Sequence, residues 1–202
     1  FRFVNDNIVN TKYNEWKEKG KRWKETVDFI YDNDTVPFDN KENKFYFSGG
    51  SQHKIRKDYC NFLKNNLDIC DGYFWNYKEP QLMKINKCGS EFQSFSKHFE
   101  YKYPLCIDGL SGTDRMRLLL CLNAVPILYD SPYEEFYSNL LSENHNYILF
   151  KDIIDLKKVI ENRDNNMDNQ IIQNNQEFIK TILTYENMLT YIADLLNALN
   201  RE

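Results

Sequence analysis

The chain has 202 residues and a formal net charge of -4, with 42% hydrophobic and 15% aromatic residues. Such a length suits one good-sized domain, and this apolar fraction can build a core, which argues against wholesale disorder. The acidic balance argues against a general nucleic-acid binder, because such proteins carry a basic surplus.

The five cysteines are scattered, form no CxxC pair and share no zinc spacing with histidine. No metal site is therefore expected. Cys106 and Cys121 lie in apolar runs and are expected to be small buried hydrophobic side chains. The odd count favours reduced thiols, and one or two disulfides are the alternative. The loop sequence Asp32-Asn33-Asp34 is expected to be solvated, without partners. No apolar run is long enough to span a bilayer, so the sequence predicts no transmembrane segment.

Helical patterns and short apolar strands alternate along the chain. Helical spacing predicts helices at 12–31, 54–65, 90–99, 114–122, 133–141, 152–162, 171–183 and 184–199. Apolar runs predict strands at 45–47, 67–74, 103–107, 125–129 and 147–150. Pro126 removes a backbone donor, so its strand is expected to be short or near a sheet edge. The alternation predicts an α/β fold, a parallel sheet with helices on both faces.

The segment 101–129 predicts a buried strand, a polar turn, a helix and a second buried strand. Ser111 and Asp114 have the spacing of a capping box, and a helix that starts there presents free backbone N–H groups to an anion. Arg115 adds a fixed positive charge that can bind phosphate. The alternative is a capped helix with its arginine in solvent, and spacing alone does not decide between them.

A second turn of this kind lies upstream, at Ser48-Gly49-Gly50-Ser51, with Arg56 in the following helix. Its glycines let the backbone approach a ligand closely. The alternative is an ordinary strand-to-helix turn. The chain contains neither a P-loop nor GxGxxG, which counts against an ATPase and a classical NAD enzyme. Two such turns in one domain suggest a diphosphate ligand, such as a nucleotide sugar.

Two further residue groups carry weaker signals. Glu134 and Glu135 are expected to begin a helix after a strand, where a carboxylate can bind ribose hydroxyls. Acidic residues also favour any helix N-terminus, which is the simpler explanation. His53, His98 and His145 are dispersed and imply neither a catalytic triad nor a metal site.

From about Trp23 to its end, the chain resembles the CAP10-type glycosyltransferases of family 90. These include protein O-glucosyltransferases, capsule xylosyltransferases and lipopolysaccharide-modifying enzymes. Three segments carry the resemblance, in the family's order. They are 36–56 (family pattern PW..K....FFRG....R), 101–119 (KY...DG...S.R...LL) and 131–147 (S...EW...L.P..HY).

The resemblance implies a GT-B architecture, in which this chain is the C-terminal, donor-binding half. It implies transfer of glucose, xylose or a similar sugar from a UDP-sugar to a hydroxyl of a glycan or protein. Inversion is expected, with no cofactor or essential metal. The implied donor contacts are Ser48, Gly49, Gly50, Arg56, Leu110, Ser111, Gly112, Thr113, Asp114, Arg115 and Glu135.

This sequence departs from the family pattern at several places. Ser48 stands where the family usually has arginine, and Asn146-Tyr147 replaces a His-Tyr pair. Nothing in residues 1–22 matches the surroundings of the family's catalytic aspartate, so the general base is expected upstream of this chain. No catalytic residue is therefore assigned within it.

We divide the chain into an N-terminal helical segment at 1–35, a Rossmann-like donor-binding domain at 36–183 and a C-terminal helix at 184–202. The first segment is expected to be the end of a preceding domain. Two alternatives to a glycosyltransferase remain open. One is a non-catalytic relative that binds a nucleotide sugar or a partner protein, and the other is an unrelated α/β nucleotide-binding domain.

Overall fold

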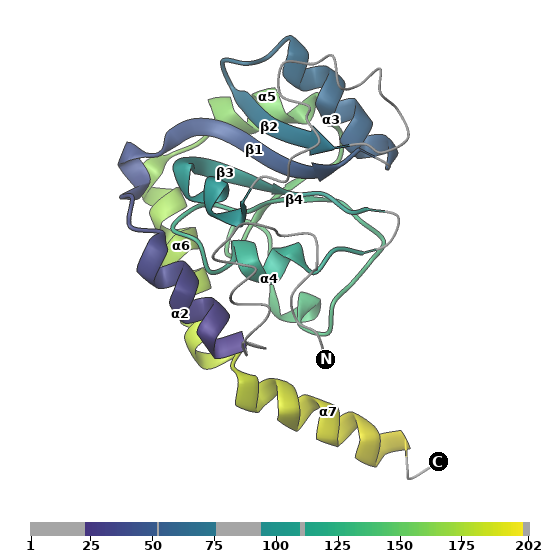
Figure 1. Ribbon diagram of the computed structural model, residues 1–202. Helices are drawn as coiled ribbons and strands as arrows, with labels where there is room; N and C mark the ends of the chain where they lie inside the picture. Colours follow the sequence, from purple (N-terminus) through teal and green to yellow (C-terminus); the bar gives the residue numbers. More distant parts are fainter. Residues whose placement is uncertain (1–22, 52, 76–93, 110–111, 200–202) are drawn as a thin grey trace.

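A parallel sheet forms the centre of the computed structural model, which describes residues 23–51, 53–75, 94–109 and 112–199 (Figure 1). Its strand order is β2-β1-β3-β4-β5, and every neighbouring pair is parallel. The strands are β1 (Glu42–Gly50), β2 (Cys70–Trp75), β3 (Tyr101–Cys106), β4 (Ile127–Tyr129) and β5 (Ile148–Phe150). The predicted Rossmann-like α/β fold is confirmed.

Helices cover both faces of this sheet. The α-helices are α2 (Trp23–Asn33), α3 (Lys54–Lys64), α4 (Arg115–Leu119), α5 (Asp155–Glu161), α6 (Asn165–Thr181) and α7 (Tyr185–Leu199). Short 3-10 helices are η1 (Phe38–Asn40), η3 (Phe95–Glu100) and η4 (Ser138–Leu140). Figure 1 shows α3 and α5 on one side of the sheet and α4 on the other.

Side-chain alternation along the strands divides the core into two clusters. Phe45 and Phe47 pack with Tyr59 of α3 and with α5 on one face. Cys106 packs with Met116 of α4 and with α2 on the other face. The long helix α6 contributes to the first cluster near its start and to the second near its end. It therefore binds the two layers together along one side of the sheet.

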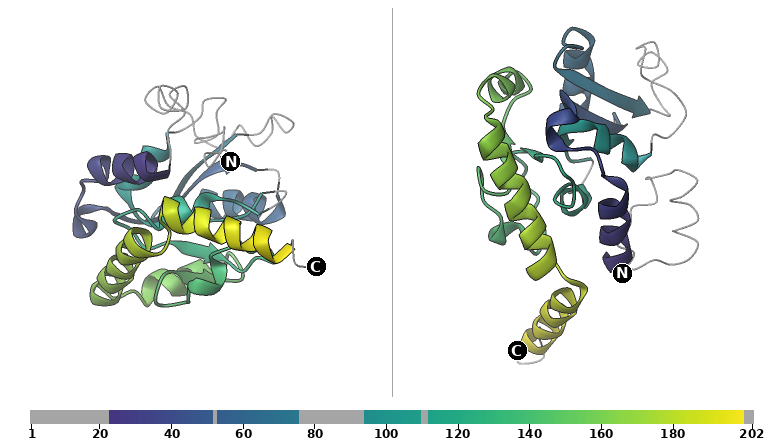
Figure 2. Two further views of the ribbon diagram at one scale, coloured as in Figure 1. Left: turned by 90° about the horizontal axis from the view of Figure 1, so that it is seen from below. Right: turned by 90° about the vertical axis from the view of Figure 1, so that its left-hand side faces the viewer.

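The last helix, α7, leads away from the sheet beyond the end of α6 (Figures 1 and 2). Met188 is buried, whereas several apolar side chains farther along α7 are exposed, namely Leu189, Leu195, Leu196 and Leu199. Within the described ranges, no helix is both long enough and apolar enough to cross a membrane.

Several predicted boundaries were wrong. The segment 133–141 is mostly coil, with η4 near its end, because Ser138 Oγ accepts the Glu135 N–H at 2.8 Å and competes with helical bonding. Helix α6 begins at Asn165 instead of residue 171, since Asp164 caps it by accepting the Asn166 N–H at 2.9 Å. The expected helical residues 12–22 and 90–93 lie outside the described residues, and the rest of the helix expected at 90–99 is the 3-10 helix η3.

The strand that follows Pro126 is short, as expected, but it does not lie at the sheet edge. β4 pairs with β3 on one side and with β5 on the other. The proline precedes the first residue of β4, and its carbonyl accepts the Ile148 N–H at 3.0 Å. Pro126 therefore lies just before the paired residues of β4, where its missing N–H does not interrupt the hydrogen bonds between strands.

The loop that contains Asp34 is not solvated as the sequence analysis expected. Lys41 Nζ donates to Asp34 Oδ1 at 2.5 Å, and the side chains of this ion pair are 0% and 2% exposed. Asp34 Oδ2 also accepts the Asn123 N–H at 2.7 Å. A buried carboxylate needs such partners, and these contacts fix the segment before β1 to the loop after α4.

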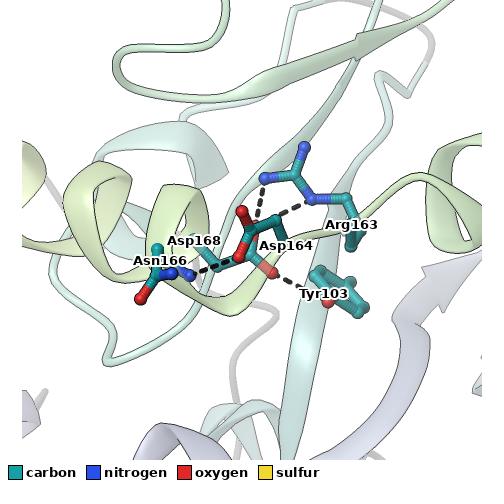
Figure 3. Close-up of polar contacts among 5 residues, drawn as sticks. All are labelled: Tyr103, Arg163, Asp164, Asn166 and Asp168. Carbon is teal, nitrogen blue, oxygen red and sulfur yellow. Dashed lines mark hydrogen bonds and ion pairs between the residues drawn. The ribbon is translucent and has the colours of Figure 1, made fainter.

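A second buried network joins the start of α6 to the middle of β3 (Figure 3). The guanidinium of Arg163 donates to Asp168 Oδ1, with Nε at 2.8 Å. Tyr103 Oη donates to the other carboxylate oxygen at 2.9 Å. The Asp168 side chain is 0% exposed. Burial, followed by the Asp168 charge, raises the pKa of Tyr103, so its hydroxyl stays a donor.

Asn144 has a left-handed backbone (φ 61°) in the turn before β5, and among the described residues other than glycine it alone has a positive φ. Asparagine tolerates this conformation better than residues with ordinary side chains. We expect Asn144→Ala to lower the free energy of unfolding by about 1 kcal/mol, whereas Asn144→Gly leaves it unchanged or raises it slightly. Urea denaturation measures both variants, and equal stability of the alanine variant and the wild type would contradict this prediction.

Candidate anion-binding site

The chain changes direction across the sheet between β1 and β3. From β1 it runs through α3 to β2 on one side, and from β3 it runs through α4 to β4 on the other. Because α3 and α4 lie on opposite faces, the connections diverge at the carboxyl ends of β1 and β3. Ligands of open α/β sheets bind in such a crevice. The turn predicted after residue 107 follows β3. The turn predicted at 48–51 was wrong in its bounds, because Ser48, Gly49 and Gly50 continue β1 and pair with β2.

Arg56, near the start of α3, connects the carboxyl ends of β1 and β3. Its Nε and Nη2 donate to the Ile107 carbonyl at 3.2 and 2.7 Å, and its Nη1 donates to the Gly50 carbonyl at 3.3 Å. A Cβ on Gly109 would lie 3.5 Å from Arg56 Nη2. The guanidinium therefore lies directly beside the turn that follows β3.

Arg115, the first residue of α4, reaches across to β1. Its Nη2 donates to the Ser48 carbonyl at 2.7 Å. Its Nη1 is buried and has no hydrogen-bond partner among the described residues. A buried donor without a partner costs free energy. An anionic ligand at this position would supply the acceptor.

The two guanidinium groups stack on one aromatic ring. Arg56 and Arg115 lie over Phe47 with their Cζ atoms 5.1 and 4.7 Å from the ring centroid. Gly49 leaves room for this ring, since a Cβ there would come within 2.7 Å of Phe47 Cζ. The sequence analysis predicted that Gly49 lets a ligand approach the backbone. In the structure, its missing side chain makes room for the Phe47 ring that both arginines contact.

The electrostatic environment makes this arginine pair receptive to negative charge. Burial, followed by repulsion from Arg115, lowers the pKa of Arg56 to about 9. Burial likewise lowers the pKa of Arg115. At pH 7 both groups are positive and repel each other. An anion that contacts both groups would relieve the repulsion and form charge-assisted hydrogen bonds.

A cavity of about 480 Å³ opens at the carboxyl ends of β3 and β4, beside Gly112 and Thr113 of the turn that follows β3. Its described lining contains four tyrosines and four carboxylates, and no lysine or arginine. These are Tyr129, Tyr133, Tyr137, Tyr147, Asp108, Asp130, Glu134 and Glu135. Such a lining suits an uncharged ring with hydroxyl groups better than a phosphate.

Asp108 joins the loops on the two sides of this cavity. Its Oδ1 accepts the Thr113 N–H at 3.0 Å, and its Oδ2 accepts the Ser131 hydroxyl. The Asp108 side chain thereby fixes the loop after β4 against the turn after β3.

The structure separates the predicted site residues into groups. Ser48, Gly49, Gly50, Arg56 and Arg115 meet at the carboxyl end of β1. Gly112, Thr113 and Glu135 line the cavity. Asp114 instead pairs with Arg117 at 2.8 Å, and Leu110 and Ser111 lie outside the described residues.

One part of the predicted binding mode was wrong. The helix that carries Arg115 begins after Asp114 and has five residues, and Asp114 makes no side-chain capping bond. The expected capping box would require Asp114 inside the helix. A helix this short provides little dipole, so the positive charge comes from the arginine side chains. The expected helix start at Glu134 and Glu135 is likewise absent, since these residues lie in coil.

Residue-by-residue reasoning did not select Asp108, Ser131 or the tyrosines as site residues. Asp108 had a usable signal, because it follows a fully buried strand at the sheet edge where ligands bind. The tyrosines had none, since their convergence depends on the folding of a coil segment.

Comparisons with known proteins agree with this fold and order of motifs. The family described as "Glycosyl transferase family 90" matches residues 9–201. Protein O-glucosyltransferase 3 of Homo sapiens is 27% identical over 128 residues, 60% of this chain and 24% of that protein. Protein O-glucosyltransferase 2 of Danio rerio is 26% identical over 166 residues, 78% of this chain and 32% of that protein.

Among solved structures, that of TarM superposes with a TM-score of 0.51 at 12% identity. The superposition covers 78% of this chain and 36% of that one, and it shows a shared fold. The chain spans about a quarter to a third of the length of these curated relatives.

Proposed function

Because the chain belongs to glycosyl transferase family 90, we propose that it binds a UDP-sugar and serves transfer of the sugar to a hydroxyl of a glycan or protein. The observation that carries this proposal is the arginine pair, Arg56 and Arg115, stacked on Phe47 between β1 and β3. A UDP leaving group gains negative charge as the glycosidic bond breaks. Fixed cations at that position stabilise the transition state.

The unpartnered Nη1 of Arg115 supports an anionic ligand over a purely structural role for this side chain. An arginine that only joined β1 to α4 would be satisfied by backbone carbonyls, as the Nη2 of Arg115 is by the Ser48 carbonyl. The Nη1 group is buried without such a partner among the described residues. A diphosphate oxygen is the acceptor that fits a guanidinium best.

The neighbouring cavity supports the remainder of the ligand. Its tyrosines provide apolar ring faces and hydroxyls, and carboxylates such as Glu135 accept hydrogen bonds from sugar or ribose hydroxyls. Burial raises the pKa of Glu135, while the Arg117 charge opposes this shift. We place the diphosphate on the arginine pair and the uncharged rings of the donor toward the cavity.

Transfer also needs a general base that removes the proton from the acceptor hydroxyl. We place this base, an aspartate, and the acceptor site in the preceding domain of a GT-B enzyme, of which this chain is the donor-binding half. The proposed reaction inverts the sugar and needs no metal.

A second candidate function is binding of a nucleotide sugar without transfer, because the arginine pair can hold a diphosphate while no general base is assigned within the described residues. Incubation with UDP-glucose or UDP-xylose separates the two, because released UDP indicates turnover. Donor hydrolysis or transfer by the 202-residue chain would rule out the non-catalytic alternative.

Calorimetric titration with UDP, ADP and GDP tests the proposed donor class. We expect UDP to bind most tightly, and binding to weaken as salt screens the arginine pair. Equal affinity for all three diphosphates would contradict the proposed specificity for a UDP-sugar. Absence of UDP binding would remove the proposed function.

A further inference from the structure

Tyr133 has no place in the arginine site, yet its position is closely defined. Its side chain is 52% exposed and lines the cavity at the carboxyl ends of β3 and β4. A Cβ on Gly112 would lie 3.0 Å from Tyr133 Cβ and 3.4 Å from Cγ. The tyrosine therefore rests directly on the turn that follows β3, at a residue where a larger side chain would displace it.

A series of hydrogen bonds holds Tyr133 in this position. Its N–H donates to Ser131 Oγ at 3.1 Å, and the Ser131 hydroxyl donates to Asp108. Asp108 in turn accepts the Thr113 N–H from the turn itself. The backbone that carries Tyr133 is thus tied to the turn that its side chain contacts.

The two ends of this turn present different chemistry. A Cβ on Gly109 would lie 3.5 Å from Arg56 Nη2, and a Cβ on Gly112 would lie 3.0 Å from Tyr133 Cβ. The cavity wall next to the tyrosine contains no lysine or arginine among the described residues. A ligand lying along this turn would meet a positive charge at one end and an exposed aromatic side chain at the other.

We propose that the base of the bound nucleoside diphosphate stacks on Tyr133, which makes this residue a determinant of donor specificity. The inference rests on the proposed function and adds the orientation of the ligand, with the diphosphate at Arg56 and the base at Tyr133. A planar base matches the aromatic face of tyrosine, whereas hydroxyl-rich rings match the neighbouring carboxylates. Stacking on one aromatic side chain is typical of base recognition.

Paired titrations with UDP and inorganic pyrophosphate test this orientation on the 202-residue chain. Tyr133→Ala is expected to raise the UDP dissociation constant about tenfold, the size of a lost base–aromatic stack, and to leave pyrophosphate binding unchanged. Tyr133→Phe keeps the ring and should bind UDP within about twofold of the wild type. Leu67→Ala, at an apolar residue with an exposed fraction of 53% and outside the cavity, is the control and should change neither affinity.

Two results would overturn the inference while leaving the proposed function intact. One is unchanged UDP affinity in Tyr133→Ala. The other is an equal loss for UDP and pyrophosphate, which would mean that the ring supports the turn and does not contact the base. If the unmodified chain bound neither UDP nor pyrophosphate, the proposed function would fail and this inference with it.

Discussion

Replacing Arg115 by alanine is expected to weaken UDP binding by roughly ten- to a hundredfold. A hydrogen bond to a charged group contributes about 1.5–3 kcal/mol, and each 1.4 kcal/mol is about a factor of ten in affinity. Arg115 supplies the buried Nη1 that has no acceptor among the described residues, so its loss removes a donor aimed at the ligand. Isothermal calorimetry with UDP measures the change.

Arg117→Ala is the matched control for this variant, because it removes the same side chain from the same short helix. Arg117 pairs with Asp114 and lies over Trp23, with its Cζ 5.5 Å from the ring centroid. We expect it to lower stability and to leave the UDP affinity of the folded protein unchanged. Arg115→Lys keeps the charge but loses the planar fork, so intermediate affinity is expected. UDP affinity in Arg115→Ala equal to that of the wild type would remove the proposed diphosphate site.

Asp168→Ala is expected to lower the free energy of unfolding by about 3–5 kcal/mol, the usual cost of removing one partner of a buried ion pair. The substitution leaves the Arg163 guanidinium, 10% exposed, without its carboxylate, and it leaves the Tyr103 hydroxyl without its acceptor. Contact between α6 and β3 would weaken with it (Figure 3). Urea denaturation measures the loss.

Two further variants separate the parts of this network. Tyr103→Phe removes one hydrogen bond and should cost about 1 kcal/mol. Glu161→Ala, at an exposed acidic residue at the end of α5, should change stability by less than about 0.5 kcal/mol. A loss below about 1 kcal/mol in Asp168→Ala would contradict the account of a buried, charge-dependent contact.

Local sequence pattern was sufficient to predict the sheet and to select candidate site residues. Apolar runs such as 103–107 identified the strands, and alternation of strands with helices identified the parallel topology. Glycines and serines indicated the carboxyl ends of β1 and β3, although Ser48, Gly49 and Gly50 belong to β1 itself. Ligands bind beyond such strand ends, which made Arg56 and Arg115 candidates without knowledge of their contacts.

The remaining features depend on contacts between residues far apart in the sequence. Asp34 looked solvated because its partner Asn123 lies 89 residues away. The polar run 163–170 looked like a loop because Asp168 becomes buried only when Tyr103, 65 residues away, approaches it. The coil 133–137 has apolar spacing typical of a helix, but a side-chain bond from Ser138 competes with that helix. The contacts of Asp34 with Asn123 and of Asp168 with Tyr103 leave no local signal, whereas the Ser138 bond spans only three residues and was outweighed by the apolar spacing.

Hydrogen–deuterium exchange with and without saturating UDP tests the central claim most directly, because it locates the ligand on the chain. The account predicts slower exchange in the presence of UDP at the carboxyl ends of β1 and β3, in peptides that contain 48–56 and 106–115. No protection at these two strand ends, under conditions where UDP binds, would contradict it.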